Sequence, residues 1–285
     1  MKLFKSLKIC FTAVLLSTPF FSLAQYKFEI KPFFSYFRDL SRWEIGGTGL
    51  LASGSFDGVT RITGYNNTYY IGDSTLKRGL TSKPSFGGSI GIAVPFAAAG
   101  HISVWALSMH AMVNQYSWSD LNQTKGLDGT YTVNPIPLSA TTMQIAVPIG
   151  IDYKIGCDAI ATRRLMFGGA LGAGVMPHIN ITSLEPSAAG DVEQPQQAIG
   201  FNPYVKAEGS IFPGMCVKLR VLYTMGNIEL MNTKNAIPNY TDGPFKMYNK
   251  SSLMVSLLIM PFSTRWKETA WWNTRDSYNW NERLN

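Results

Sequence analysis

The sequence is short of charged residues. Only 15% of its 285 residues are Asp, Glu, Lys or Arg, whereas a soluble domain usually carries about 25%. The formal net charge of +7 is a mild excess, and no Lys/Arg-dense run is interleaved with stacking aromatic residues, so we expect no nucleic acid partner. The low charge indicates that much of the surface faces something other than water.

Long apolar runs are also missing from the body of the chain. The best candidate for a membrane-spanning helix, residues 84–119, contains no charged residue, but glycines, prolines and histidines interrupt it. A spanning helix needs about 20 predominantly apolar residues in succession. The sequence therefore argues against a helical membrane protein.

Residues 1–24 have the composition of a signal peptide. Three lysines precede an apolar stretch at residues 9–16, and the small-x-small sequence Ser22-Leu23-Ala24 is a cleavage site. We predict export with cleavage after Ala24, which removes three positive charges and leaves +4.

Cysteine is scarce as well. Cys10 leaves with the predicted signal peptide, and Cys157 and Cys216 remain. An exported chain meets an oxidising compartment, so these two residues are a candidate disulfide.

The rest of the chain alternates apolar residues with small or polar ones. In 143–154, for example, Met143, Ile145, Val147, Ile149, Ile151 and Tyr153 occupy one parity, and small or polar residues occupy the other. A period of two places these sets on opposite faces of a β-strand. In a membrane barrel the apolar face contacts lipid and the small or polar face lines the interior.

This pattern predicts eight strands, at 44–57, 81–96, 101–118, 139–155, 162–178, 198–212, 215–230 and 248–262. Their connections alternate between short (97–100, 156–161, 213–214) and long (58–80, 119–138, 179–197, 231–247). Short periplasmic turns and long extracellular loops are typical of outer-membrane barrels.

The pattern resembles the small, eight-stranded OmpA-like class of bacterial outer-membrane β-barrels. The resemblance covers about 44–262 and rests on alternation and loop asymmetry, without a specific motif. It implies an all-β, up-and-down antiparallel transmembrane barrel in the outer membrane, in contact with outer-membrane lipid and lipopolysaccharide. The remaining parts are the signal peptide 1–24, a periplasmic lead 25–43 and a periplasmic C-terminal tail 263–285.

Several inward-facing residues of the predicted barrel are charged. They are Asp152, Lys154, Lys206, Glu208, Lys218 and Arg220. Because a buried charge is costly unless it is paired, we expect a charge network that neutralises and rigidifies the lumen. A narrow ion path is the alternative.

Histidine is too sparse and too scattered to indicate a metal site. His101, His110 and His178 show no ligand spacing, so no metal or cofactor is expected. Lipid-modifying barrels combine His with Ser, but here His110 and Ser108 both face inward and Gly-x-Ser-x-Gly is absent. We therefore expect no enzyme.

Aromatic residues gather near the strand ends and in the tail. Two rims of four are expected to be interfacial girdles, Tyr116, Trp118, Tyr223 and Tyr248 at one end and Trp43, Tyr153, Phe212 and Phe262 at the other. The tail carries Trp266, Trp271, Trp272 and Trp280. Tryptophan is a preferred interface anchor, so these four are candidates for binding a protein partner, with packing on the periplasmic rim as the alternative.

The sequence therefore predicts a structural or scaffold component of a cell-envelope assembly, with a secretion-related role among the candidates and the tail docking a partner. A narrow pore or a surface adhesin using the long loops is the alternative. A lipid-modifying enzyme comes third.

Overall fold

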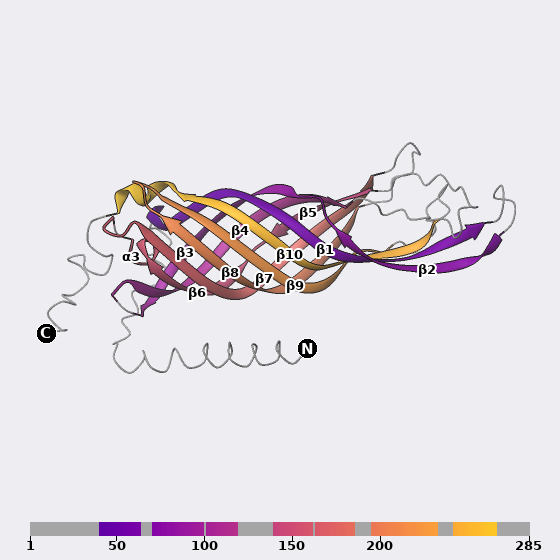
Figure 1. Cartoon of the computed structure of the whole chain (residues 1–285), viewed down its shortest axis with the longest axis horizontal. Coiled ribbons are helices and arrows are strands. Elements are labelled where there is room, and N and C mark those ends of the chain that lie inside the picture. The colour runs from indigo at the N-terminus through magenta and orange to yellow at the C-terminus, as the bar shows by residue number, and fades with distance from the viewer. Residues whose placement is uncertain are drawn as a thin grey trace.

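The computed structural model describes residues 40–63, 70–99, 101–118, 139–161, 163–185, 195–232 and 242–266, which form a closed antiparallel β-barrel (Figure 1). The predicted signal peptide, residues 25–39 of the predicted lead and residues 267–285 of the tail lie outside the described residues. Within the described part of the chain, no helix is long and apolar enough to cross a membrane.

Within the described ranges, ten strands build the wall. They are β1 (Trp43–Thr63), β2 (Tyr70–Thr81), β3 (Ser85–Ala98), β4 (Ser103–Trp118), β5 (Ser139–Ala146), β6 (Ile149–Gly156), β7 (Phe167–Glu185), β8 (Gln196–Ile211), β9 (Cys216–Asn232) and β10 (Asp242–Met260). Short helices accompany them: η1 (Leu40–Arg42), α3 (Cys157–Ile160) and η4 (Pro261–Arg265).

These ten strands occupy eight positions around the barrel. β5 and β6 pair with the same two neighbours, β4 and β7, and are separated only at residues 147–148, where Pro148 lacks an N–H. β2 and β3 likewise pair with successive parts of β1 and are separated around Pro84. Pairing of β1 with β10 closes the ring, so the predicted eight-stranded architecture is confirmed.

The two faces of the wall follow the predicted parity. On β6, Ile151 faces outward and is 51% exposed, whereas its neighbour Asp152 faces inward and is fully buried. The outward side chains of the other strands are likewise mostly apolar and exposed. An apolar outer belt around a polar interior is the arrangement of a transmembrane barrel.

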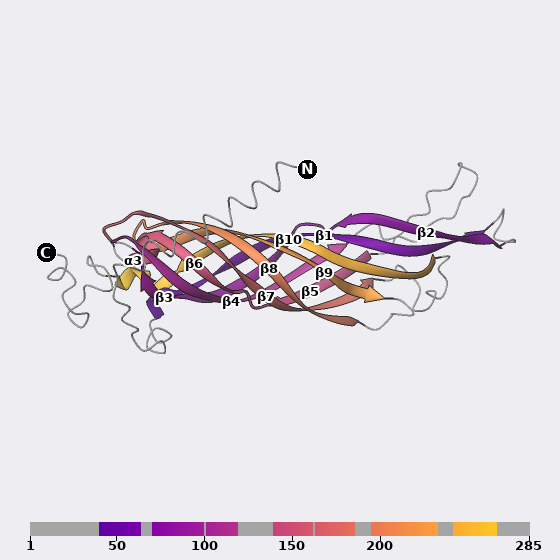
Figure 2. The same ribbon diagram turned by 90° about the horizontal axis from the view of Figure 1, so that it is seen from below.

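The strands extend beyond the predicted boundaries at one end of the barrel. β1 runs to Thr63 and β2 begins at Tyr70, and the hairpin that they form projects past the other strands (Figures 1 and 2). β7, β8, β9 and β10 also reach into segments predicted as loops. The prediction that 58–80, 179–197 and 231–247 are loops throughout is therefore wrong. The residues at these strand ends are largely polar, so the apolar alternation used to predict strands does not extend to them. They are strands nevertheless, because the backbone hydrogen bonds between strands need no apolar side chains.

Candidate functional site

Charged side chains gather inside the barrel. At the end with the short turns, inward side chains from β1, β6, β8 and β9 and from α3 meet in a set of ion pairs, here called the charge network. Its members are Glu44, Asp152, Lys154, Asp158, Lys206, Glu208, Lys218 and Arg220. The structure thus brings together all six charged residues that the sequence placed in the lumen.

Arg220 lies between two carboxylates. Its Nε donates to Oε1 of Glu208 at 2.6 Å, and its Nη2 donates to Oε1 of Glu44 at 2.6 Å. The imidazole of His110 contacts the same Glu44 oxygen, and its Nε2 is 2.8 Å from the Arg220 guanidinium. Hydrogen bonds between ionised groups are the strongest class, so Arg220 fixes β1 and β8 relative to β9.

Lys218 and Lys154 connect the network to the turn after β6. Lys218 Nζ lies 2.9 Å from Glu44 Oε2 and 2.8 Å from Asp158 Oδ2, and Lys154 Nζ donates to that same Asp158 oxygen at 2.7 Å. Burial alone would raise the pKa of the Asp158 carboxyl. The ammonium groups of Lys154 and Lys218 lower that pKa by more than burial raises it, so the net shift is downward. α3 therefore closes this end of the lumen with an ionised carboxylate.

Lys206 organises the part of the network nearest the middle of the barrel. Its Nζ lies 2.8 Å from Asp152 Oδ2 and 3.3 Å from Glu208 Oε1, and it donates to Ser108 Oγ at 3.0 Å. Gly172 makes room for this pair, because a Cβ at residue 172 would meet the Asp152 carboxylate and Cε of Lys206. Small residues on one strand thus accommodate long ones on the next.

The network is balanced in charge. Its four carboxylates face four cations, and the members are at most 7% exposed. Buried ions are tolerated only when each is paired and hydrogen-bonded. The arrangement therefore fills and neutralises the lumen near the short turns.

Two members of the network were missed in the sequence. Glu44 shares its parity on β1 with the buried residues Thr48, Leu50 and Ala52, and that alternation could have placed it in the lumen. Asp158 lies in a turn, where strand parity predicts nothing, so only the tertiary structure shows that α3 places it beneath Lys154 and Lys218.

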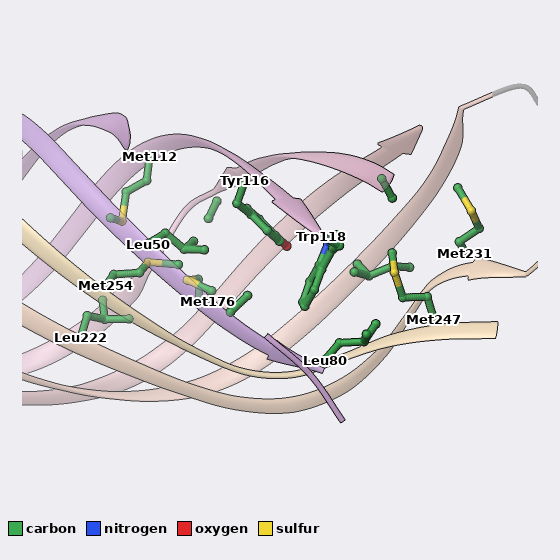
Figure 3. Close-up of a cluster of buried hydrophobic side chains, with 14 of the residues drawn as sticks. Leu50, Leu80, Met112, Tyr116, Trp118, Met176, Leu222, Met231, Met247 and Met254 are labelled. Carbon is green, nitrogen blue, oxygen red and sulfur yellow. The ribbon is translucent and has the colours of Figure 1, made fainter. Parts of the chain in front are cut away.

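Toward the other end the lumen contains a cluster of buried apolar side chains, here called the apolar plug, together with buried polar side chains such as Gln144 and Asn180. The plug includes Leu50, Met112, Tyr116, Trp118, Met176, Leu222, Met247 and Met254, which come from β1, β4, β7, β9 and β10 (Figure 3). The rings of Tyr116 and Trp118 lie edge to face at 5.5 Å, and Trp118 Nε1 donates to Thr142 Oγ1 at 3.1 Å. These two rings cross the lumen at the level where β4 ends.

The predicted aromatic girdles are wrong for three residues. Tyr116 and Trp118 point inward and are 2% and 0% exposed, so they belong to the plug. Phe212 is buried at the opposite end. Tyr153, Tyr223 and Phe262 do face outward and are exposed, and Tyr153 packs against Trp105 with ring centroids 5.1 Å apart.

The first tryptophan of the tail packs against the barrel. Trp266 is 4% exposed, stacks on Phe212 with centroids 5.4 Å apart, and donates from Nε1 to the Ser41 carbonyl at 3.3 Å. Just before it, Ser263 Oγ accepts from the Cys216 N–H at 2.8 Å. Residues 263–266 therefore cover the end of the barrel, and Trp271, Trp272 and Trp280 lie outside the described residues.

The two mature cysteines lie in this same region. Cys157 and Cys216 share one buried cluster with Phe212 and Trp266, and both are free thiols. The hydrogen bond between the two thiols lowers the pKa of the Cys157 thiol. Proximity and a more acidic thiol favour oxidation, and the disulfide stays a prediction.

The histidines show no metal-binding arrangement in the described part of the chain. His110 contacts Glu44 and Arg220 of the charge network, and His178 is buried with its Nδ1 2.9 Å from the Met176 carbonyl oxygen. Among the described residues, no group of three or more His, Cys, Asp or Glu side chains is placed to hold a metal ion.

Comparisons with known proteins identify no family for this chain. No family model and no curated protein matches it. Similar solved structures include the outer-membrane protease OmpT of Escherichia coli, at 9% identity with a TM-score of 0.41, covering 78% of this chain and 97% of that one. OprG of Pseudomonas aeruginosa is 12% identical with a TM-score of 0.36, covering 75% and 95%. Ail, the attachment invasion locus protein of Yersinia pestis, solved with the heparin analogue sucrose octasulfate, is 8% identical with a TM-score of 0.29, covering 75% and 99%.

Proposed function

We propose that this protein is a structural barrel of the bacterial outer membrane that serves as an anchor or scaffold in a cell-envelope assembly. The observation that carries the proposal is the closed lumen, filled by the charge network at one end and by the apolar plug at the other. A barrel without an open passage acts through its two ends and its outer wall.

The filled lumen also weighs against the pore alternative. The interior of an eight-stranded barrel is just wide enough to be filled by side chains. Here Arg220, Lys218 and Trp118 are among the largest fully buried side chains. In planar bilayers we expect the purified protein to give no steady single-channel conductance, and a stable open level would contradict the scaffold role.

The periplasmic end is the proposed docking side. Trp266 is held by Phe212 and Ser41, so it fixes the point from which residues 267–285 continue. We propose that the three later tryptophans, Trp271, Trp272 and Trp280, bind a periplasmic or outer-membrane protein, because burial of an indole gives strong anchoring.

A truncation tests this docking. A chain ending at Trp266 keeps η4 and its contacts, so its heat-modifiable gel migration is expected to match that of the full chain. A partner that cross-links to and co-purifies with the full chain is expected to be lost. The full-length Trp271→Ala/Trp272→Ala variant should lose the same partner. A partner retained by both variants would overturn the docking role.

A surface adhesin is the second candidate, and the β1–β2 hairpin favours it. β1 and β2 stay paired from Ser53↔Thr81 to Thr63↔Tyr70, beyond the point where β3 pairs with β1. Replacing residues 58–76 by a two-residue turn should leave the barrel folded. Loss of cell attachment with unchanged partner binding would favour the adhesin over the scaffold.

A catalytic role is not part of the proposal. The Ser108 and His110 side chains that the sequence singles out are buried and bonded to Lys206 and Glu44, respectively. Neither is accessible to a lipid or peptide substrate. Release of acyl chains from outer-membrane glycolipid by the purified protein would contradict a purely structural role.

A further inference from the structure

The outer wall carries a polar cavity at the base of the β1–β2 hairpin. Its volume is about 570 Å³, within the range of small-molecule sites. β1, β2, β9 and β10 all contribute to its lining, which includes Asp57, Lys77, Gly79, Asn227, Tyr248 and Lys250. The cavity is separate from the lumen, since the inward neighbours Phe56 and Met247 are buried on the opposite face of the wall.

The cavity lies where the apolar outer belt ends. The last large exposed apolar side chains before it are Leu51 on β1, Met225 on β9 and Leu253 on β10. Lys250 precedes Leu253 by three residues, at most about 10 Å along β10. If the belt contacts lipid chains, the cavity is at the level of the headgroups in the outer leaflet.

The cavity has an excess of cations available to a ligand. Asp57 lies opposite Lys77 on β2 and Lys246 on β10, and Lys246 is also 3.9 Å from the carboxylate of Glu229. Lys77 and Lys250 are exposed, and no ion pair joins either to another of the residues that the structure describes. The lining itself thus holds two ammonium groups, those of Lys77 and Lys250, and one carboxylate, that of Asp57.

We propose that this cavity binds the phosphorylated sugar headgroup of a glycolipid in the outer leaflet. Lys77 and Lys250 would contact the phosphate, because ammonium groups form charge-assisted hydrogen bonds with phosphate oxygens. Asp57, Asn227 and Tyr248 supply acceptors and donors for sugar hydroxyls. This inference rests on the membrane location in the proposed function and assigns the lipid contact to one site.

Gly79 provides a way to fill the cavity without removing any charge. A Cβ at residue 79 would meet no atom within 4 Å, so a larger side chain fits there without displacing the wall. The Gly79→Trp variant therefore blocks the cavity sterically, whereas Lys77→Ala and Lys250→Ala remove its cations. Lys83→Ala is the matched control, because Lys83 is exposed near the same end but does not line the cavity.

The experiment uses the full-length protein in detergent micelles and a diphosphorylated glucosamine-disaccharide glycolipid, with binding measured by native mass spectrometry. We expect the double variant Lys77→Ala/Lys250→Ala to bind about tenfold more weakly or worse. Gly79→Trp should lose binding, and Lys83→Ala should bind as the unmodified protein does. The dephosphorylated glycolipid should bind the unmodified protein as weakly as the phosphorylated one binds the double variant.

Three results would overturn the proposal. They are unchanged binding by both cavity variants, equal affinity for the dephosphorylated glycolipid, and complete displacement by inorganic phosphate at matched concentration, which would assign the cavity to a soluble anion. Heat-modifiable migration and bilayer conductance are recorded on the same preparations. If the cavity binds no glycolipid but the barrel is intact and non-conducting, only the cavity proposal is contradicted and the proposed function stands. If the barrel does not insert into the membrane, the proposed function itself is contradicted.

Discussion

Near the short turns the lumen is filled by four carboxylates and four cations, whereas toward the hairpin end its main filling is a cluster of leucines, methionines and aromatic rings. Both fillings close the barrel, but they depend on different physics. Each buried charge needs its particular partner, while unbranched methionine side chains adapt to irregular gaps. The charged half should therefore tolerate single substitutions less well than the apolar half.

The largest effect is expected at the centre of the charge network. Arg220→Met removes the guanidinium between Glu44 and Glu208, and an uncompensated buried charge costs about 3–5 kcal/mol. Urea unfolding in detergent micelles should show this loss of stability, and the exposed control Lys83→Met should stay within about 0.5 kcal/mol. Adding Glu208→Gln to Arg220→Met restores the charge balance and should recover part of the loss. Full stability of Arg220→Met would show that the network is dispensable.

The apolar plug should respond less strongly. Met176→Ala leaves a cavity in the buried cluster, and we expect a cost of about 2 kcal/mol, the low end for such a truncation, because neighbouring methionines can shift. Met143→Ala is the matched control, since Met143 faces outward and is 41% exposed. If Met176→Ala lost more unfolding free energy than Arg220→Met, the expected order of sensitivity of the two halves would be reversed.

The outer belt offers a test of the wall itself. Ile151→Arg places a charge on the lipid side, which costs about 2–4 kcal/mol near the middle of the membrane and less toward the interface. Ile151→Val keeps the surface apolar and should be nearly neutral. Folding into vesicles, followed by heat-modifiable migration, measures both. Equal insertion of the two variants would contradict the assignment of this face to lipid.

Acid should weaken the charged half selectively, through Asp158. Because the pKa of this carboxyl is lower in the folded protein than its ordinary value of 3.8, its contribution is complete above that value and is lost as the pH falls through the folded pKa. Asp158→Asn should therefore be less stable than the unmodified protein at neutral pH, on the order of 1 kcal/mol, and the difference should vanish in acid. A difference that persists at low pH would mean that the carboxylate charge is not responsible.

The smallest expected effect concerns the two cysteines. Cys157 and Cys216 already share a buried cluster, so a bridge between them adds little packing. Protein isolated without reductant is expected to show no thiol that reacts with a maleimide after unfolding, and a mass lower by about two hydrogens. Two reactive thiols in such protein would end the disulfide prediction.

The alternation of residue types by itself determined the barrel architecture of this protein and the face of the wall on which most strand residues lie. Period two placed Ile151 outside and Asp152 inside, and it predicted eight strands and six members of the charge network, because on a strand the choice of face depends only on parity. The same rule found no role for Asp158, which lies in a turn. Tyr116 and Trp118 were placed in a girdle because they lie near a strand end, although their parity on β4 is that of the buried residues His110 and Met112.

Only the tertiary structure decided which inward residues meet and how much space each has. Ion pairs such as Glu44 with Arg220 join residues 176 positions apart, and that contact depends on closure of the ring through β1 and β10. Parity assigns Gly150 to the lumen but does not show how little space is available there. A Cβ at residue 150 would meet the Tyr204 hydroxyl and lie 2.5 Å from the Ala173 carbonyl oxygen. Trp266 is part of the tail by sequence and part of the barrel by contact. The physical reason is the same in each case: parity is a local property of one strand, whereas pairing, space and burial depend on strands that only the closed barrel brings together.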